Sequence, residues 1–221
     1  MIERYGNIAL ADIRAEKPEV WDFQEATHAR VQLPASPENV MAMQKEGFLW
    51  ADRTLKTSIV LGRCTADLDR MIRLPVVETR DFKDDIFRIA CASFTYDRRF
   101  HIEPACSAST AALVLREWVD ELGEVLICQF RNLPVGFLTL KQKAEDTLFV
   151  HLAAVEEKYR MTGAAMTLYA TACKLARERG FKKLEGRISS QNTAVMNVYA
   201  AFGASFSEPV DIFLKRLHHD A

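Results

Sequence analysis

A strand-to-helix step in the second half of the chain carries the residues best suited to chemistry. From Leu152 to Ala165 the sequence reads LAAVEEKYRMTGAA, a pattern that predicts a strand running through a turn into a helix. The residues after Arg160 are mostly small where the helix would begin. The first turn of a helix has unpaired N–H groups and the positive end of the helix dipole, so small side chains there let a pyrophosphate approach the backbone. The segment predicts an anion-binding helix start; a helix start with an incidental glycine is the alternative.

A second pattern lies between residues 189 and 203. Asn192 is a good helix N-cap, and Tyr199 follows seven residues later. Seven residues make about two helical turns, so both side chains are expected on one side of a short helix. A tyrosine phenol is a hydrogen-bond donor at neutral pH. Tyr199 is therefore a candidate general acid, and a core tyrosine on an amphipathic helix is the alternative.

Together the two segments resemble the GNAT acetyltransferase superfamily, whose acetyl-coenzyme A loop has the form Arg/Gln-x-x-Gly-x-Gly/Ala. Arg160, Gly163 and Ala165 match that loop, while Phe202-Gly203 reverses the family's usual Gly-Phe order. The resemblance implies an α/β (α+β) GNAT fold, with a mixed, mostly antiparallel sheet whose fourth and fifth strands splay apart. It also implies that acetyl-coenzyme A binds the edge of the fourth strand, the loop and the later helix, through Ala153, Ala154, Val155, Arg160, Met161, Thr162, Gly163, Ala164, Ala165 and Asn192.

The same resemblance implies catalysis by direct attack of an amine in a ternary complex. Tyr199 would lie beside the sulfur and protonate the leaving thiolate. For the base, the two-residue period of a strand places His151, Ala153 and Val155 on one face, and an imidazole titrates near neutral pH. A strand histidine without a role is an equal alternative for His151, and His101 is a competing candidate.

The acceptor is predicted from residues 92–104, which read ASFTYDRRFHIEP and precede Glu117-Trp118-Val119. This region is similar to the acceptor side of TDP-fucosamine acetyltransferase and related nucleotide-amino-sugar N-acetyltransferases, apart from one extra arginine. The resemblance implies an anionic, nucleotide-linked amino-deoxysugar. Four residues would bind it: Arg98 and Arg99 at phosphates, Phe100 on a sugar face and His101 at a hydroxyl or the amine. A solvated basic face with Phe100 in the core is the alternative.

Two other functions compete with this interpretation. One is an N-acetyltransferase for a polyamine, an amino acid or a protein amine. Carboxylates would line a polyamine site, whereas the candidate acceptor segment is basic and aromatic. The other is a non-catalytic coenzyme A-binding domain, which predicts loss of Tyr199 or of the small residues after Gly163; neither is lost.

The elements expected to position these residues fall into two parts. Residues 1–74 are predicted as a small N-terminal α/β module packing on the core, and residues 75–221 as the acetyltransferase domain. In the first part, strands are expected at 7–13 and 57–61, with a helix at 36–46. In the second part, strands are expected at 76–79, 125–130, 135–140, 148–155, 184–188 and 212–217, and helices at 81–93, 109–122, 162–179 and 192–201.

The amino-acid composition limits which classes of protein this chain can belong to. Of the 221 residues, 49% are hydrophobic and 27% charged, as in a globular protein, and a net charge of −1 gives no basic footprint for nucleic acid or an anionic membrane. No apolar run approaches the roughly 20 residues that span a bilayer, and the start lacks a signal-peptide layout. Scattered cysteines without C-x-x-C spacing are expected as reduced thiols in a cytoplasmic protein. No metal is expected, since the histidines show no ligand spacing; a homodimer is expected only by analogy.

Overall fold

The computed structural model describes residues 2–5, 8–23, 25–79, 82–93 and 123–217. Several predictions fall outside these residues. They are the helix expected at 109–122, the Glu117-Trp118-Val119 step, Cys106, and the four acceptor residues Arg98, Arg99, Phe100 and His101.

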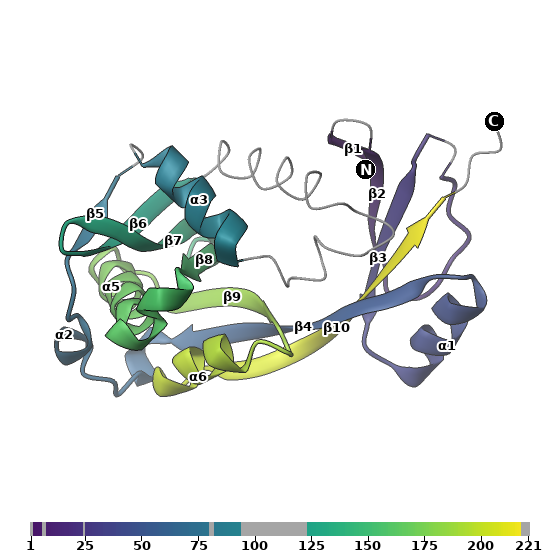
Figure 1. The fold of residues 1–221 in the computed structure, drawn as a ribbon. Coiled ribbons are helices and arrows are strands. Elements are labelled where there is room, and N and C mark those ends of the chain that lie inside the picture. Colours follow the sequence, from purple (N-terminus) through teal and green to yellow (C-terminus); the bar gives the residue numbers. More distant parts are fainter. Residues whose placement is uncertain (1, 6–7, 24, 80–81, 94–122, 218–221) are drawn as a thin grey trace.

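Ten strands of the described residues form one sheet, in the order β1-β2-β3-β10-β4-β9-β8-β7-β6-β5 (Figure 1). Only two neighbouring pairs, β2–β3 and β8–β9, are parallel. This confirms the expected α+β fold with a mixed, mostly antiparallel sheet. The strands are β1 (Ile2–Tyr5), β2 (Ile8–Arg14), β3 (His28–Pro34), β4 (Leu49–Val60), β5 (Val76–Glu78), β6 (Glu124–Phe130), β7 (Leu133–Ala144), β8 (Thr147–Val155), β9 (Lys183–Ser189) and β10 (Ser205–Arg216).

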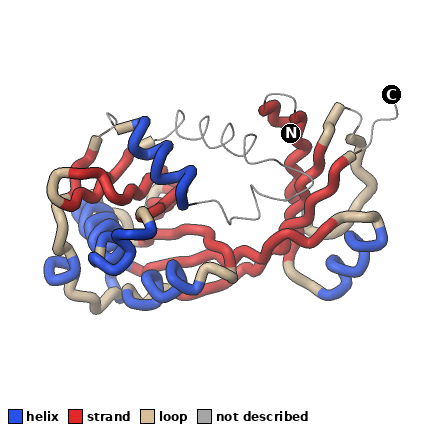
Figure 2. The backbone as a smooth tube through the Cα atoms, in the orientation of Figure 1, coloured by secondary structure: helices blue, strands red, loops and turns tan. Residues whose placement is uncertain are grey.

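Helices cover both faces of this sheet (Figure 2). They are α1 (Pro37–Lys45), α2 (Leu68–Met71), α3 (Lys83–Ser93), α5 (Ala164–Glu178) and α6 (Thr193–Ala201), with 3₁₀ turns at Leu61–Arg63 and Glu157–Thr162. One core lies between the sheet and α5 and α6, and includes Leu138, Leu168 and Phe202. A second core, with Ile89 and Phe137, lies under α3 on the other face. Each described helix of four residues or more except α2 matches an expected one within two residues at either end.

The long strand β4 joins the two parts of the chain. It overlaps the strand expected at 57–61 over residues 57–60 but begins at Leu49, and it lies between β9 and β10. Figure 1 shows β4 and β10 running from the group of β5–β9 to the group of β1–β3 and α1. The hydrogen-bonded sheet thus crosses the division expected at residues 74 and 75; a separate module of residues 1–74 stays a prediction.

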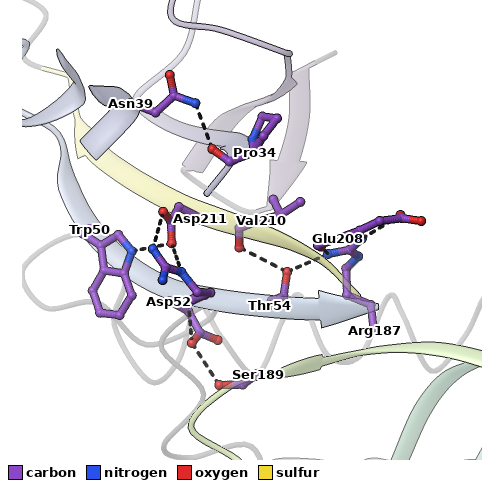
Figure 3. Close-up of polar contacts among 11 residues, drawn as sticks. Pro34, Asn39, Trp50, Asp52, Thr54, Arg187, Ser189, Glu208, Val210 and Asp211 are labelled. Atoms are coloured by element: carbon purple, nitrogen blue, oxygen red, sulfur yellow. Dashed lines mark hydrogen bonds and ion pairs between the residues drawn. The ribbon is translucent and has the colours of Figure 1, made fainter. Parts of the chain in front are cut away.

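A buried polar network fixes β4 against β10 (Figure 3). Asp211 is fully buried, and Arg53 donates two hydrogen bonds to its two carboxylate oxygens, at 2.8 and 2.9 Å. The indole N–H of Trp50 donates to the same carboxylate at 2.9 Å. Charged groups in this arrangement are both paired and hydrogen-bonded, which offsets the loss of hydration on burial.

Similar contacts join β4 to β9. Ser189 Oγ donates to Asp52 Oδ1 at 2.9 Å, and Arg187 Nη1 donates to Thr54 Oγ1 at 3.2 Å and to the Glu208 carbonyl at 3.1 Å. Figure 3 shows Arg187 reaching across β4 toward Glu208 on β10. The end of β9 is therefore held by side chains as well as by the strand ladder.

None of the described helices is long and apolar enough to cross a membrane.

Candidate active site at the splay between β8 and β9

The strands β8 and β9 part halfway along their length. Their parallel pairing runs from Thr147 opposite Lys183 to Val150 opposite Gly186. Beyond Val150, β8 stays paired with β7 up to Val155, which lies opposite Gly136. Within the described residues, the side of β8 that faces β9 has no strand partner from residue 151 to 155. This confirms the expected splay and leaves a free strand edge.

A β-bulge accompanies the splay. Two residues of β8, His151 and Leu152, lie opposite Thr139 of β7, where the register shifts. Thr139 Oγ1 fills the bulge: it accepts a hydrogen bond from Leu152 N at 2.9 Å and donates to Leu152 O at 3.3 Å. A bulge of this kind bends and twists the strand that carries it, so it supplies a local reason for β8 to leave β9.

The bulge also changes which side chains share a face. Val150, Ala153 and Val155 all pack on the α5 core, whereas Leu152 packs on the α3 core. The strict alternation that predicted one face for His151, Ala153 and Val155 is therefore wrong at this point of the strand. His151 is half-buried; its role as the base stays a prediction.

The predicted anion-binding step follows β8 directly. The 3₁₀ turn Glu157–Thr162 leads to Gly163, which has φ +83° and ψ 9° and caps α5 without a side-chain hydrogen bond. This left-handed conformation favours glycine. Thr167 N donates a hydrogen bond to Gly163 O at 2.9 Å, which closes the first turn of α5. The N–H groups of residues 164–166 therefore stay available at the helix start, beside exposed Arg160 and Met161.

A buried carboxylate connects this turn to α3. Glu156 ends the free strand edge, and its side chain forms ion pairs with Arg88 and Lys158. Burial opposes ionisation of Glu156, but the hydrogen bonds from Arg88 and Lys158 outweigh it and lower its pKa. The carboxylate is therefore charged at neutral pH and holds α3 to the turn.

The phenol of Tyr199 lies where the two strands part. Tyr199 is almost fully buried, and its ring packs edge-on against Tyr169 at 4.9 Å between centroids. A Cβ placed on Gly186 would lie only 2.2 Å from Tyr199 Oη, so the hydroxyl sits directly against the last β9 residue paired with β8. Burial raises the pKa of Tyr199, which keeps the phenol protonated at neutral pH.

Asn192 begins the same helix. Its side chain accepts a hydrogen bond from Val195 N at 3.1 Å, which confirms the predicted N-cap. The side chain of Asn192 is nevertheless exposed, whereas Tyr199 is buried. The seven-residue spacing predicted that Asn192 and Tyr199 lie on one side of the helix. The two side chains do not share an environment, because the N-cap residue lies outside the regular turns of the helix.

Among the predicted residues, the structure places the free edge Ala153–Val155 and the loop Arg160–Ala165 in one continuous run, with Tyr199 at the splay. Sequence reasoning missed Thr57, Thr139, Glu156 and Gly186. Only Gly186 carries a signal, because a glycine inside a strand marks a close approach. The described residues contain no group of three His, Cys, Asp or Glu side chains that could hold a metal, and the described cysteines are free thiols.

Comparison with known proteins agrees with this geometry. The model of the acetyltransferase (GNAT) family matches residues 84–204, more than half of the chain. The chain belongs to the GNAT acetyltransferase family. The match contains α3, the splay, the loop before α5 and Tyr199, but it leaves out β4.

Two solved structures share this fold. A conserved protein of unknown function from Staphylococcus epidermidis is 15% identical with a TM-score of 0.66, over 87% of this chain and 74% of the other. A GCN5-related N-acetyltransferase from Sphaerobacter thermophilus is 14% identical with a TM-score of 0.56, over 88% and 62%. At such identities the likeness shows the fold alone.

A third relative is an L-2,4-diaminobutyric acid acetyltransferase from Streptomyces coelicolor. It is 42% identical over 74 residues, which cover 32% of this chain and 44% of the relative. The chain thus spans less than half the length of the curated relative that it matches.

Proposed function

We propose that this chain is an acetyl-coenzyme A-dependent N-acetyltransferase acting on a small amine. The observation that carries the proposal is the protonated phenol of Tyr199 against Gly186, at the point where β8 and β9 part. The free edge of β8 and the helix start after Gly163 follow one another along the chain, and both are features that a long, phosphate-bearing thioester requires.

Coenzyme A fits the described residues in two places. Its pyrophosphate would accept hydrogen bonds from N–H groups at the start of α5, where the small residues Gly163 and Ala165 are partly exposed. Its pantetheine arm would pair with the backbone of Ala153–Val155 as an added strand. Bound in this way, the thioester would lie in the splay, and acetyl transfer is the chemistry that it supplies.

Different residues of the chain would then have different roles in the reaction. The attacking amine must be neutral, and His151 or a chain of water molecules would take its proton. Backbone N–H groups on the β8 edge would donate to the oxyanion. Tyr199 would give its proton to the leaving sulfur. A phenol is protonated at neutral pH and can therefore donate a proton to a developing thiolate.

For the acceptor we propose a small amino acid that carries a second amine. The partial match to a diaminobutyric acid acetyltransferase supports this class. A nucleotide-linked amino-deoxysugar is the second candidate, favoured by the basic, aromatic run Asp97-Arg98-Arg99-Phe100-His101.

The test is release of coenzyme A by the purified protein with acetyl-coenzyme A and a panel of amines. The panel contains diamino acids, monoamino acids, polyamines, peptides and amino-sugar nucleotides. We expect turnover on a diamino acid, and Tyr199→Phe should lower kcat about 100-fold with little change in the KM for acetyl-coenzyme A. Turnover only on an amino-sugar nucleotide would replace the acceptor. Binding of acetyl-coenzyme A without turnover of any amine would instead establish a non-catalytic coenzyme A-binding domain.

A further inference from the structure

A buried hydroxyl from outside the family-matched segment lies beside the proposed acid. Thr57 belongs to β4 and is fully buried. Its Oγ1 has no hydrogen bond of regular geometry within the described residues, and the group that it lies close enough to bond is the phenol of Tyr199, whose pKa it lowers. A buried hydroxyl without such a bond is unfavourable, and valine would fill the same volume without that disadvantage. The presence of threonine at this position therefore needs a reason.

The geometry around Gly186 supplies one. Thr57 lies directly opposite Gly186 in the β4–β9 ladder. A Cβ on Gly186 would be 2.2 Å from Tyr199 Oη and 3.1 Å from Thr57 Oγ1. The two hydroxyls thus converge on the space that a glycine leaves open. Burial raises the pKa of Tyr199, and the neighbouring hydroxyls of Thr57 and Tyr169 act in the opposite direction by favouring the ionised phenol.

We propose that Thr57 is a positioning residue for Tyr199 in acetyl transfer, so that β4 completes the site from outside the segment that the family model matches. This inference rests on the proposed function, since it requires Tyr199 to act as the acid. A hydroxyl can donate as well as accept. Thr57 accepts from the phenol before transfer, and turns to donate to the phenolate oxygen as the proton leaves.

The neutral amine nitrogen bonds to the thioester carbonyl carbon, and the carbon–sulfur bond breaks with its electron pair on sulfur. Sulfur takes the proton of Tyr199. The proton that the nitrogen releases returns to Tyr199 through solvent. During this exchange the phenolate is buried among Thr57, Tyr169 and Gly186, where a donated hydrogen bond stabilises it more than in water.

Two variants separate positioning from packing. Thr57→Val keeps the volume and removes the hydroxyl, whereas Thr57→Ser keeps the hydroxyl and removes a methyl group. We expect Thr57→Val to lower kcat about tenfold at unchanged KM for acetyl-coenzyme A, the effect of one hydrogen bond in the transition state. Thr57→Ser should restore most of kcat. Thr54→Val is the matched control, since Thr54 is equally buried on the same strand but bonds Val210 and Arg187.

A second measurement works without turnover. Tyrosine labelled at Cζ gives an NMR resonance for Tyr199, assigned with Tyr199→Phe, that reports on contacts of the phenol. We expect this resonance to move in Thr57→Val and to stay in Thr54→Val. If no amine is acetylated, a shift in Thr57→Val still upholds the contact while the proposed function fails. An unmoved resonance, or equal kcat values for the parent and Thr57→Val, would overturn the inference.

Discussion

Two polar regions lie on the same strand, β4, and differ in how completely their groups are bonded. Around Asp211, both carboxylate oxygens have close partners: Arg53 contributes two hydrogen bonds and Trp50 a third (Figure 3). Around Tyr199, the hydroxyls of Thr57 and Tyr199 meet over Gly186 without a hydrogen bond of normal geometry to Thr57. The carboxylate of the first region has its hydrogen-bond donors, whereas Thr57 Oγ1 in the second region lacks a hydrogen bond of normal geometry.

This difference indicates different tasks. A fully bonded, buried ion pair fixes two strands, and removing one partner leaves an unpaired charge. Incompletely bonded groups in a buried position are where bound substrates and proton transfers are accommodated. We therefore expect changes around Asp211 to act on stability, and changes around Tyr199 to act on kcat.

The largest effect should follow Arg53→Met. The variant leaves the fully buried carboxylate of Asp211 with the Trp50 indole as its remaining donor. We expect the free energy of unfolding to fall by about 3 kcal/mol, the lower end of the range for breaking a buried pair, because Asp211 is buried but the Arg53 side chain is 43% exposed. Urea unfolding measures it, and kcat should stay near the parent value while the protein is folded.

Two controls sharpen this prediction. In Arg53→Met/Asp211→Asn the buried group is neutral, so part of the lost stability should return. Lys174→Met breaks the exposed pair with Asp69 and should cost no more than about 0.5 kcal/mol. A tenfold loss of kcat in folded Arg53→Met would remove the distinction between the two regions.

A smaller effect on stability, with a larger one on kcat, is expected for Gly186→Ala. The new Cβ would lie 2.2 Å from Tyr199 Oη, so the phenol must move. Overpacking of this kind costs about 1–3 kcal/mol, and the displaced acid should lower kcat about as much as Tyr199→Phe does. Chemical unfolding and steady-state kinetics measure the two effects.

The double variant Gly186→Ala/Tyr199→Phe tests the cause. Removing the hydroxyl takes away the closest contact, so stability should recover relative to Gly186→Ala alone, and a double-mutant cycle should show strong coupling. Additive losses would mean that the two residues do not touch in solution.

The comparison also explains what the sequence could and could not predict. The loop after β8 and the N-cap Asn192 depend on neighbours in the chain, and their helix starts were predicted within two residues. The strands β1 and β3 were not predicted at all. The splay was expected from a resemblance, but the bulge at His151 and Leu152 that accompanies it was not, because a bulge depends on the partner strand.

Long-range contacts could not be predicted from the sequence either, because they also depend on which strands pair. Thr57 lies opposite Gly186 only because β4 is inserted between β9 and β10, and nothing local to Thr57 signals that neighbour. Asp211 and Arg53 are likewise far apart in the chain. Local patterns predicted the phosphate-binding step and the tyrosine, whereas the groups that position them come from strand order.

Glu156 is the intermediate case and gives the smallest expected effect. It forms ion pairs as Asp211 does, but it lies at the start of the proposed coenzyme A loop, and Arg88 is half exposed. Solvent screens such a pair, so Glu156→Gln should lower the free energy of unfolding by about 1 kcal/mol at neutral pH. Because the folded pKa of Glu156 lies below its usual 4.5, its contribution is fully present above pH 4.5 and is lost as the pH falls through the folded value. Urea unfolding of parent and variant between pH 7 and pH 3 should therefore converge on acidification. A difference that stays constant over this range would mean that the charge of Glu156 does not stabilise the fold, and would place it with the Tyr199 region instead.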